Sequence, residues 1–277
     1  MAEWREELRE LPASSLMQML RGYEYGRNAA TLRGQVGMQS PQLQNEAGQN
    51  PLAAYFEAHT EGPGLWKWRH YFDIYHRHFQ KFRGRKITVL EIGVFSGGSI
   101  GMWQDYFGDG CQFHGIDILA SCKTYENENV RIHIGDQGDR SFWKRMRQEI
   151  PAIDIIIDDG SHVPEHQIIS MEEMLPHVSP GGVYLCEDTY SVGNQFHDFV
   201  SGMGHWMDEL GRCAPGVSDP HEGSLANAVQ RDVQSIHKYP YVTVLEKRDR
   251  PLEILSAPRR GTQWQPWHQE DEAQSEG

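Results

Sequence analysis

Acidic residues stand at the ends of two apolar runs in the middle of the chain. The stretch IIIDDGSH passes from isoleucines 155–157 into Asp158 and Asp159, and the stretch VYLCED ends in Glu187 and Asp188. Neighbouring negative charges repel each other, so a cation or a set of hydrogen-bond donors has to compensate them. Because consecutive side chains of a strand point to opposite faces, the two aspartates need not share one environment.

The second of these aspartates and the later pair of acids form a candidate metal site. If the apolar runs are adjacent parallel strands, Asp159, Glu187 and Asp188 converge at one sheet edge, which is strongly destabilising unless they are protonated or neutralised by a cation. An all-oxygen ligand set suits a hard divalent ion, and Mg²⁺ leaves positions open for water or substrate oxygens. His162 follows on the turn after Asp159, where a neutral imidazole could serve as general base beside a metal-bound hydroxyl. The alternative is that the acids cap helices and that the histidine packs or caps.

The elements that position these residues follow an alternating pattern. From residue 86 onward, short apolar runs alternate with helical stretches of about ten residues, which is typical of β-α-β units around a buried parallel sheet. The final runs, in VQSIHKYPYVTVLEK, leave almost no room for a helix, so we expect an antiparallel pair at one sheet edge. The predicted fold is α/β: a Rossmann-like, doubly wound, mostly parallel seven-stranded sheet with an antiparallel edge hairpin and an N-terminal helical extension. Ligands of such sheets bind at the carboxyl ends of the strands.

The first predicted strand runs into a loop of small residues, LEIGVFSGGSIGMW, which would let the backbone approach a ligand closely. The loop is neither G-x-G-x-x-G nor a P-loop, because no G-K-[ST] follows. The next two strands end in Asp117, placed for ribose hydroxyls, and in the Asp136–Gln137 pair. A tight turn without a ligand, with each acid as an ordinary helix cap, is the alternative. The candidate cofactor-binding residues are Glu91, Gly93, Ser96, Gly97, Gly98, Ser99, Asp117, Asp136, Gln137 and Asp158.

These motifs resemble those of known enzymes. The pattern E-x-G-x-x-x-G after the first strand resembles the S-adenosylmethionine loop of class I methyltransferases. The stretch from IDIIIDDGSH to LCEDTY resembles metal-dependent O-methyltransferases of the macrocin and mycinamicin type, which methylate antibiotic sugars. With WKWRHYFDIYHRHF at its start and SIHKYPYVTVLEK at its end, the resemblance covers roughly two thirds of the chain. The first 50 residues and the expected substrate loop, YSVGNQFHDFVSGMGHW, depart from the family pattern.

The resemblance implies cofactors and residue roles. It implies S-adenosylmethionine and Mg²⁺ as cofactors, metal ligands at Asp159, Glu187 and Asp188, and a general base at His162. It also places the Asp136–Gln137 pair beside the adenine. The spacing from Asp159 to Glu187 matches catechol O-methyltransferase as well, in which a lysine stands at the position of the base.

The predicted function is methyl transfer from S-adenosylmethionine to a hydroxyl of a small-molecule natural product, with a sugar hydroxyl of a glycoside preferred. A catechol or phenol acceptor is the alternative within the same enzyme class, and a non-catalytic cofactor-binding scaffold is the alternative outside it. A nicotinamide oxidoreductase would leave the carboxylate cluster without a purpose. Trp103, His197, Trp206 and the region of Trp264 could form a hydrophobic wall for an aglycone, although core packing accounts for each equally well.

Three segments are expected along the chain: an N-terminal helical and loop extension at 1–60, a methyltransferase domain at 61–258 and an acidic tail at 259–277. Within the extension, helical spacing at 4–22 is followed by a polar segment at 26–50 that lacks periodicity.

The stretch GLWKWRHYFDIYHRHFQKF predicts an aromatic amphipathic helix that leads into the first strand. We expect its histidines, His70, His76 and His78, to occupy packing and surface positions, with His70 and Tyr71 near enough to reach a pocket.

Charge and composition limit the partners and the location. The formal net charge of −13 repels a phosphate backbone and argues against a nucleic-acid substrate. No stretch approaches the roughly 20 apolar residues that cross a bilayer, and the charged start MAEWREELRE is unlike a signal peptide. The cysteines form no C-x-x-C pair, which fits a reducing compartment. We therefore expect a cytoplasmic protein without membrane contact, and the resemblance implies a homo-oligomer.

Overall fold

The computed structural model of the chain describes residues 50–150, 152–190 and 194–262. Several predictions fall outside these residues: the helix at 4–22, nearly all of the polar segment at 26–50, and the acidic tail from 263 onward with Trp264.

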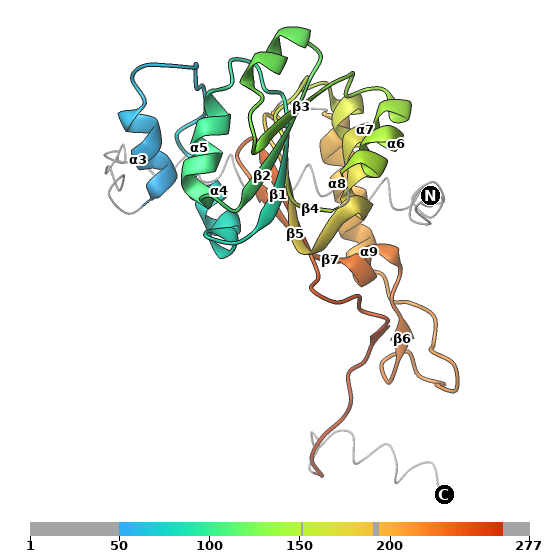
Figure 1. Cartoon of the computed structure of the whole chain (residues 1–277). Helices are drawn as coiled ribbons and strands as arrows, with labels where there is room; N and C mark the ends of the chain where they lie inside the picture. The colour runs from blue at the N-terminus through green and yellow to red at the C-terminus, as the bar shows by residue number, and fades with distance from the viewer. Residues whose placement is uncertain (1–49, 151, 191–193, 263–277) are drawn as a thin grey trace, which may run out of the picture.

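A seven-stranded sheet with the order β3-β2-β1-β4-β5-β8-β7 lies at the centre of the described part (Figure 1). Its strands are β1 (Ile87–Ile92), β2 (Cys111–Asp117), β3 (Val130–Ile134), β4 (Ile153–Asp158), β5 (Val178–Cys186), β7 (Val233–Tyr239) and β8 (Val242–Lys247). The strands β1 to β5 run parallel to one another, whereas β8 pairs antiparallel with both β5 and β7. The predicted mostly parallel sheet with an antiparallel edge hairpin is confirmed.

Helices cover both faces of the sheet. In Figure 1, α3, α4 and α5 lie on one face, and α6, α7 and α8 lie on the other. The bounds are α3 (Pro51–Ala58), α4 (Tyr71–Phe79), α5 (Gly98–Phe107), α6 (Arg140–Glu149), α7 (Pro164–Met174) and α8 (Gln195–Met207), with short 3-10 helices at Gln80–Phe82, Ala120–Tyr125 and Leu175–His177. Helix α3 belongs to the predicted N-terminal extension, yet its Leu52 is fully buried in the core beside α4 and α5.

The central strands are apolar on both faces because both faces carry helices. In β4, Ile155 and Ile157 belong to the core beneath α4 and α5, whereas Ile156 belongs to the core beneath α6 and α7. All three side chains are fully buried, and removing such a side chain from water contributes about 1.5–3 kcal/mol. The alternation continues past the end of the strand and decides which face each following acid meets.

The strand order also creates the place for a ligand. The order reverses between β1 and β4, because the chain moves outward from β1 to β3 and then returns to β4. Ligands of doubly wound sheets bind outside the carboxyl ends of the strands at such a point. The loops after β1, β4 and β5 therefore meet where the candidate site was predicted.

The aromatic stretch before β1 was predicted as one helix, and this prediction is wrong for its first part. Helix α4 begins only at Tyr71, and residues 64–69 form irregular chain that lines the cavity described below. Pro63 and Gly64 disfavour a helix at the start of the stretch. The irregular course also lets Lys67 reach buried carboxylates, a contact that helical periodicity does not reveal.

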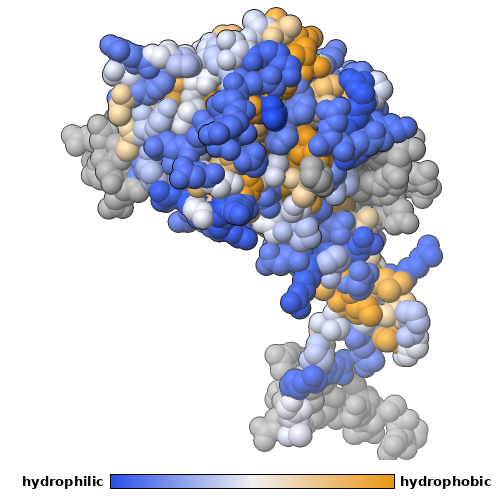
Figure 2. Space-filling view, viewed as in Figure 1, coloured by the Kyte–Doolittle hydropathy of each residue, from blue (hydrophilic) through white to orange (hydrophobic). Residues whose placement is uncertain are grey.

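Three short elements near the end of the chain were not predicted: β6 (Ser224–Leu225), α9 (Ala228–Asp232) and β9 (Ile254–Leu255). Strands β6 and β9 pair on a segment that projects from the sheet domain (Figure 1). Figure 2 shows apolar surface on this projection, where Leu225 and Ile254 are exposed. Within the described ranges, the helices are too short or too polar to span a bilayer.

A histidine pair between β2 and β3 predicts acid-sensitive stability. His114 Nδ1 lies 3.0 Å from His133 Nε2, and burial together with the charges of His133 and Arg131 lowers the pKa of His114 to about 4. The folded state keeps His114 neutral, so stability that is present above pH 6.5 is lost as the pH falls toward about 4. We expect His114→Gln to lose less stability than the parent between about pH 7 and about pH 5, measured by urea unfolding. Equal losses in the two proteins would contradict this reading, and His221→Gln, at an exposed histidine, is the control.

Candidate functional site

A cavity of about 830 Å³ opens at the carboxyl ends of the central strands. Its volume lies within the range of small-ligand sites, about 300–1,000 Å³. Most of the predicted site residues line it: Gly93, Ser96, Gly98, Ser99, Asp117, Asp136, Gln137, Asp159, His162, Glu187 and Asp188. Side chains from loops far apart in the sequence thus face one space, as the strand order requires.

The loop after β1 lies directly against the loop after β4. Gly93 has a φ of +93°, and a Cβ atom there would lie 2.0 Å from the carbonyl oxygen of Asp159, so glycine is required. The Asp117 carboxylate accepts hydrogen bonds from the backbone N–H groups of Val94 and Phe95 at 3.1 and 2.9 Å. Asp117 therefore fixes the glycine loop, and its contact with ribose hydroxyls stays a prediction.

Two predicted cofactor residues, Glu91 and Gly97, are not among the residues of the cavity wall. Glu91 is fully buried and accepts hydrogen bonds from Ser99 Oγ at 2.6 Å and Trp103 Nε1 at 3.1 Å, and burial raises its pKa. Gly97 has a φ of +75°, and a Cβ atom there would lie 2.8 Å from the ring of Tyr125. Both residues support the loop from behind the cavity.

Asp158 was predicted to face the cofactor, but it does not line the cavity. It is fully buried outside the cavity wall, and burial raises its pKa to about 6. The alternation of β4 turns it toward α7, whereas Asp159 turns to the cavity. Its carboxylate accepts hydrogen bonds from three side chains: Gln137 at 2.7 Å, Ser170 at 2.6 Å and Tyr184 at 3.1 Å. Asp158 thus holds Gln137 in place beneath the cavity.

Lys67, which was not among the predicted site residues, places its ammonium group among the acids. Its Nζ lies 2.5 Å from Asp159 Oδ2 and 3.0 Å from Glu187 Oε2, and Glu91 Oε1 is 3.9 Å away. The lysine side chain is 3 % exposed, so these are buried ion pairs. The available signal was electrostatic: converging carboxylates need a cation, and the aromatic stretch next to the first strand contains a lysine.

Burial and the ion pairs act in opposite directions on the pKa values of Lys67 and Glu187, and both values end above their ordinary ones. Burial on its own would lower the pKa of Lys67, but the charges of Asp159, Glu187 and Glu91 raise it above its ordinary value. Burial and the charge of Asp159 raise the pKa of Glu187 to about 8, against the opposing effect of Lys67. Lys67 therefore stays charged at neutral pH, and Asp159 is the carboxylate that it chiefly neutralises.

Helix α4 reaches the acids after β5 through two tyrosines. Asp188 Oδ1 accepts hydrogen bonds from Tyr71 OH at 2.7 Å and from Trp68 Nε1 at 3.0 Å. Tyr75 OH donates to Glu187 Oε1 at 2.6 Å. Because the tyrosines are four residues apart, they lie on one face of the helix and hold both acids from the same side.

His162 lies beside two of the acids on the turn after β4. Its Nε2 is 3.7 Å from Asp188 Oδ2 and 4.0 Å from Asp159 Oδ1. Its Nδ1 is buried, with no hydrogen-bond partner among the described residues. Phe95, His162 and Asp188 have φ values of +48°, +55° and +52°, which are costly for side chains with a Cβ atom. Such strain is concentrated at functional sites.

The acids and the histidine fit a divalent cation. One ligand atom each from Asp159, His162 and Asp188 lies within 4.8 Å of the others. The carboxylates together carry more negative charge than Lys67 balances, and oxygen donors suit Mg²⁺. Glu187 lines the same cavity, on the side of Lys67. The three predicted metal ligands are thus brought to one cavity, and their ligand role stays a prediction.

Exposed aromatic side chains surround the mouth of the cavity. Trp66, Phe95 and Tyr190 all line it, and they are 89 %, 71 % and 49 % exposed. Large apolar side chains that are this exposed beside a cavity point to a contact surface for a ligand. These rings were missed because each stands next to polar or small residues without a periodic pattern.

The residues considered for a hydrophobic wall lie elsewhere. Trp103 is fully buried in the core, and His197 and Trp206 belong to α8, which packs on the face opposite α4. Trp264 lies outside the described residues. Most of the stretch that was expected to be the substrate loop belongs to helix α8. Tyr190, at the start of the same stretch, does line the cavity.

The strand order and the cavity above it define the class I methyltransferase fold. No protein-family model matches the sequence. Among solved structures, the chain resembles MycE methyltransferase from the mycinamycin biosynthetic pathway in complex with Mg, SAH and mycinamycin VI. That match has a TM-score of 0.60 and 27 % identity, and it covers 82 % of this chain and 59 % of that chain. A crystal form of MycE with Mg and SAH gives a TM-score of 0.57 at 26 % identity, covering 72 % and 55 %.

The chain is also similar in sequence to curated sugar O-methyltransferases. The chain is 34 % identical over 197 residues to mycinamicin VI 2''-O-methyltransferase from Micromonospora griseorubida, which is 62 % of this chain and 47 % of that protein. It is 32 % identical over 200 residues to 8-demethyl-8-alpha-L-rhamnosyl tetracenomycin-C 2'-O-methyltransferase from Streptomyces olivaceus, covering 68 % and 52 %. Demethylmacrocin O-methyltransferase from Streptomyces fradiae is 34 % identical over 152 residues, covering 52 % and 35 %.

The chain spans about half the length of the curated relatives it matches. The predicted resemblance is confirmed, and the chain has the class I methyltransferase fold. In sequence and structure it resembles the sugar O-methyltransferases of the macrocin and mycinamicin type.

Removing Lys67 should cost stability that a divalent cation restores in part. Lys67→Met leaves Asp159 and Glu187 buried without their partner, so we expect the free energy of unfolding in EDTA to fall by about 3–5 kcal/mol. Added Mg²⁺ should restore more stability to the variant than to the parent, and urea unfolding under both conditions measures the difference. Lys123→Met, at a half-exposed lysine paired with Glu126, is the control and should change by less than about 1 kcal/mol. A Lys67 variant as stable as the parent in EDTA would contradict this role.

Proposed function

We propose that this chain transfers a methyl group from S-adenosylmethionine to a sugar hydroxyl of a glycoside, with Mg²⁺ held by the acids and His162 as general base. The observation that carries the proposal is the convergence of Asp159, Asp188 and His162 in one cavity beneath the glycine loop. The relatives that the chain resembles are sugar O-methyltransferases by name, and the MycE structures are complexes with Mg and SAH. Because the chain spans about half the length of those relatives, both its activity and its acceptor belong to the proposal.

The methyl donor would lie against the loop after β1 and the ends of β2 and β3. The glycines of this loop let the backbone approach it closely, and Asp117 would accept hydrogen bonds from ribose hydroxyls. Asp136 and Gln137 would meet the adenine. Asp136 Oδ1 accepts the N–H of Gly138 at 2.8 Å, and Gln137 Nε2 donates to Asp158 at 2.7 Å, so both residues hold fixed positions.

The acids Asp159, Glu187 and Asp188 would hold the Mg²⁺. When bound, Mg²⁺ acts as a Lewis acid that lowers the pKa of an alcohol hydroxyl and positions its oxygen. The protein keeps these acids in place through groups that are already bound to them. Lys67 holds Asp159 and Glu187, and Tyr71 holds Asp188.

His162 would take the proton from the acceptor hydroxyl. Its Nε2 lies 3.7 Å from Asp188 Oδ2 and 4.0 Å from Asp159 Oδ1, next to the acids that would position the acceptor hydroxyl. The side chain is 35 % exposed, so the proton can leave to solvent afterwards. The acceptor oxygen bonds to the methyl carbon as the bond from that carbon to the sulfonium sulfur breaks, which leaves S-adenosylhomocysteine.

The exposed rings of Trp66, Phe95 and Tyr190 form an aromatic rim of the cavity, and this rim suits an amphipathic acceptor. Trp66, Phe95 and Tyr190 offer ring faces to an apolar surface, while the acids deeper in the cavity face hydroxyl groups. A glycoside combines both properties. A catechol would also stack on the rim and would also present two neighbouring oxygens, so it is the second candidate acceptor.

An assay of S-adenosylhomocysteine formation with a panel of glycosides and catechols tests the proposal. We expect turnover of glycosides that stops in EDTA and returns with Mg²⁺, while S-adenosylmethionine still binds under chelation. A preference for catechols would favour the second acceptor class, and unchanged turnover in EDTA would remove the metal. Binding of the methyl donor without turnover of any acceptor would favour a non-catalytic scaffold.

Replacing the general base should separate catalysis from binding. We expect His162→Ala to lower turnover by about 100-fold or more, because general-base catalysis contributes that much. Titration calorimetry should give a Kd for S-adenosylmethionine within about twofold of the parent, since the imidazole points to the acids. His221→Ala, at a histidine that is 72 % exposed, is the control and should keep both values. Equal losses of turnover and affinity in the His162 variant would make the residue structural.

The rim should act on acceptor affinity alone. We expect Trp66→Ala to raise the KM for a glycoside by about tenfold, the equivalent of one lost stacking contact, with kcat nearly unchanged. Because the side chain is 89 % exposed, the thermal midpoint should stay the same. Leu225→Ala, on the projecting segment, is the matched exposed control. An unchanged KM in the Trp66 variant would exclude the ring from acceptor binding.

A further inference from the structure

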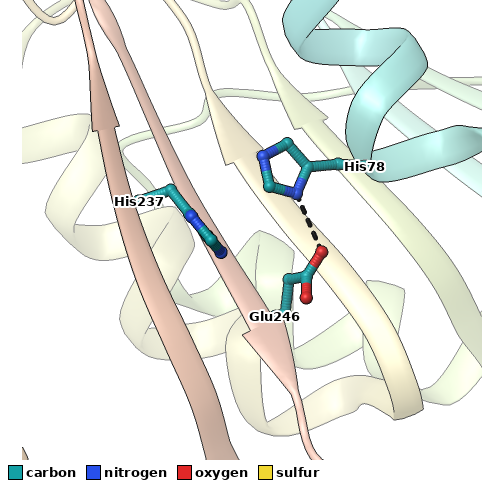
Figure 3. Close-up of side chains that lie close together, drawn as sticks. All are labelled: His78, His237 and Glu246. Atoms are coloured by element: carbon teal, nitrogen blue, oxygen red, sulfur yellow. Dashed lines mark hydrogen bonds and ion pairs between the residues drawn. The ribbon is translucent and has the colours of Figure 1, made fainter.

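A second cluster of metal-ligating side chains lies at the edge hairpin, outside the cavity wall (Figure 3). His78 comes from α4, His237 from β7 and Glu246 from β8, and Figure 3 shows the three side chains gathered between these elements. One ligand atom from each lies within 4.8 Å of the others. This arrangement brings His78 of α4 to two residues of a hairpin that lies far along the chain.

The register of the hairpin places two of these residues side by side. Ser235 pairs with Glu246, and His237 pairs with Val244, so His237 and Glu246 are diagonal neighbours on one face of the antiparallel pair. Val244 on that face belongs to the core that also contains residues of α4. This face of the hairpin therefore packs against α4, and His78 of α4 is the third residue of the cluster.

Neighbouring hydroxyl groups orient both imidazole rings. His78 Nδ1 lies 2.8 Å from Glu246 Oε1, and its Nε2 lies 2.9 Å from the hydroxyl of Tyr239. His237 Nε2 lies 2.9 Å from Ser235 Oγ. Donation from His237 Nε2 to the serine leaves a lone pair on Nδ1. A hydrogen bond on the second ring nitrogen is the usual support of a histidine that binds a metal.

The surroundings keep both kinds of ligand in the protonation state that a metal requires. His78 is 3 % exposed, and burial lowers its pKa in spite of Glu246, so the imidazole is neutral. Burial on its own would raise the pKa of Glu246. The hydrogen bond from His78 and the positive charge of Lys81 lower it instead, which favours the ionised carboxylate. Metal binding would move the proton of His78 from Nδ1 to Nε2, where the Tyr239 hydroxyl can accept it. Neutral imidazole and ionised carboxylate are the forms that bind metals.

We propose that His78, His237 and Glu246 form a zinc site that fastens α4 to the edge hairpin. Two imidazole nitrogens and one carboxylate oxygen are a common ligand set of Zn²⁺, with a fourth position for water. The His78–Glu246 contact of 2.8 Å has to lengthen, because ligand atoms of a tetrahedral zinc lie about 3.4 Å apart. A side-chain rotation of Glu246, whose side chain is 24 % exposed, is enough to supply this change.

The same surroundings disfavour the hard cations. Mg²⁺ and Ca²⁺ prefer several oxygen ligands, whereas this cluster offers one carboxylate. The charges of Arg77 and Lys81 act on the cluster as well, so net negative charge cannot attract a cation here. Bonds to imidazole nitrogen have to supply the affinity, and zinc is one of the metals that imidazole ligands suit.

Zinc at this place would fix the position of a helix that also contacts the cavity. Helix α4 holds Asp188 through Tyr71 and Glu187 through Tyr75, and His78 follows on the same face. The inference concerns the stability of this attachment and does not rest on the proposed function.

Cobalt binding in the presence of excess Mg²⁺ tests the site, because four-coordinate Co²⁺ has visible absorption bands and replaces Zn²⁺. The purified full chain, stripped of metal with a chelator, should bind one equivalent of Co²⁺ with these bands, and Zn²⁺ should displace it. We expect His237→Ala and Glu246→Gln each to weaken this binding by about 100-fold or more. Asp188→Asn, in the proposed magnesium site, and His221→Ala, at an exposed histidine, should leave it unchanged.

The outcomes separate a zinc site from a set of hydrogen bonds. Co²⁺ bands that persist in His237→Ala, or that vanish in Asp188→Asn, would overturn the proposal. The parent protein provides a second test that needs no variant: Zn²⁺ at about a hundredfold excess over Kd should raise its thermal midpoint by about 5 °C or more relative to EDTA. A parent that binds no Co²⁺ and gains no stability from Zn²⁺ would show that the three residues are joined by hydrogen bonds alone.

Discussion

The buried contact between Lys67 and the acids after β4 and β5 is the interaction on which the cavity depends. Asp159 and Glu187 stand close together because their strands are neighbours in the sheet, and two carboxylates this close would push their loops apart. The ammonium group lies 2.5 and 3.0 Å from them, offsets this repulsion and draws residues 64–69 over the strand ends. The exposed ring of Trp66 reaches the rim as a consequence of the same contact.

Helix α4 supports the site from one side. Its inner face carries Tyr71, Tyr75 and His78, which follow each other by about one turn. Each of these side chains meets an acid at or near the end of a strand: Asp188, Glu187 and Glu246. Because one short, buried helix holds all three acids, its position couples the cavity to the edge hairpin. This explains why a nine-residue helix has so many polar side chains on its buried face.

Acids at strand ends serve two purposes in this fold. Asp158 and Glu91 are fully buried and accept hydrogen bonds from neighbouring side chains, so they hold the loops that carry the cavity wall. Asp159 and Asp188 are about one-fifth exposed and face the cavity, where a cation and an acceptor can reach them. The acids of the cavity therefore depend on the packing acids, which fix the loops that carry them.

The sequence by itself determined the strands of the main sheet, the alternation of helices around it and the edge at which the chemistry gathers. Apolar runs separated by helical spacing require a sheet covered on both faces, and acids that end parallel strands must meet at one edge. Only the tertiary structure decided that Asp159 faces the cavity while Asp158 does not, that Lys67 stands among the acids, and that His78 meets Glu246 across 168 positions of the chain. Local periodicity records which face of an element is buried. It does not record which distant residue fills the space opposite, because that depends on the order of the strands and on the course of irregular chain.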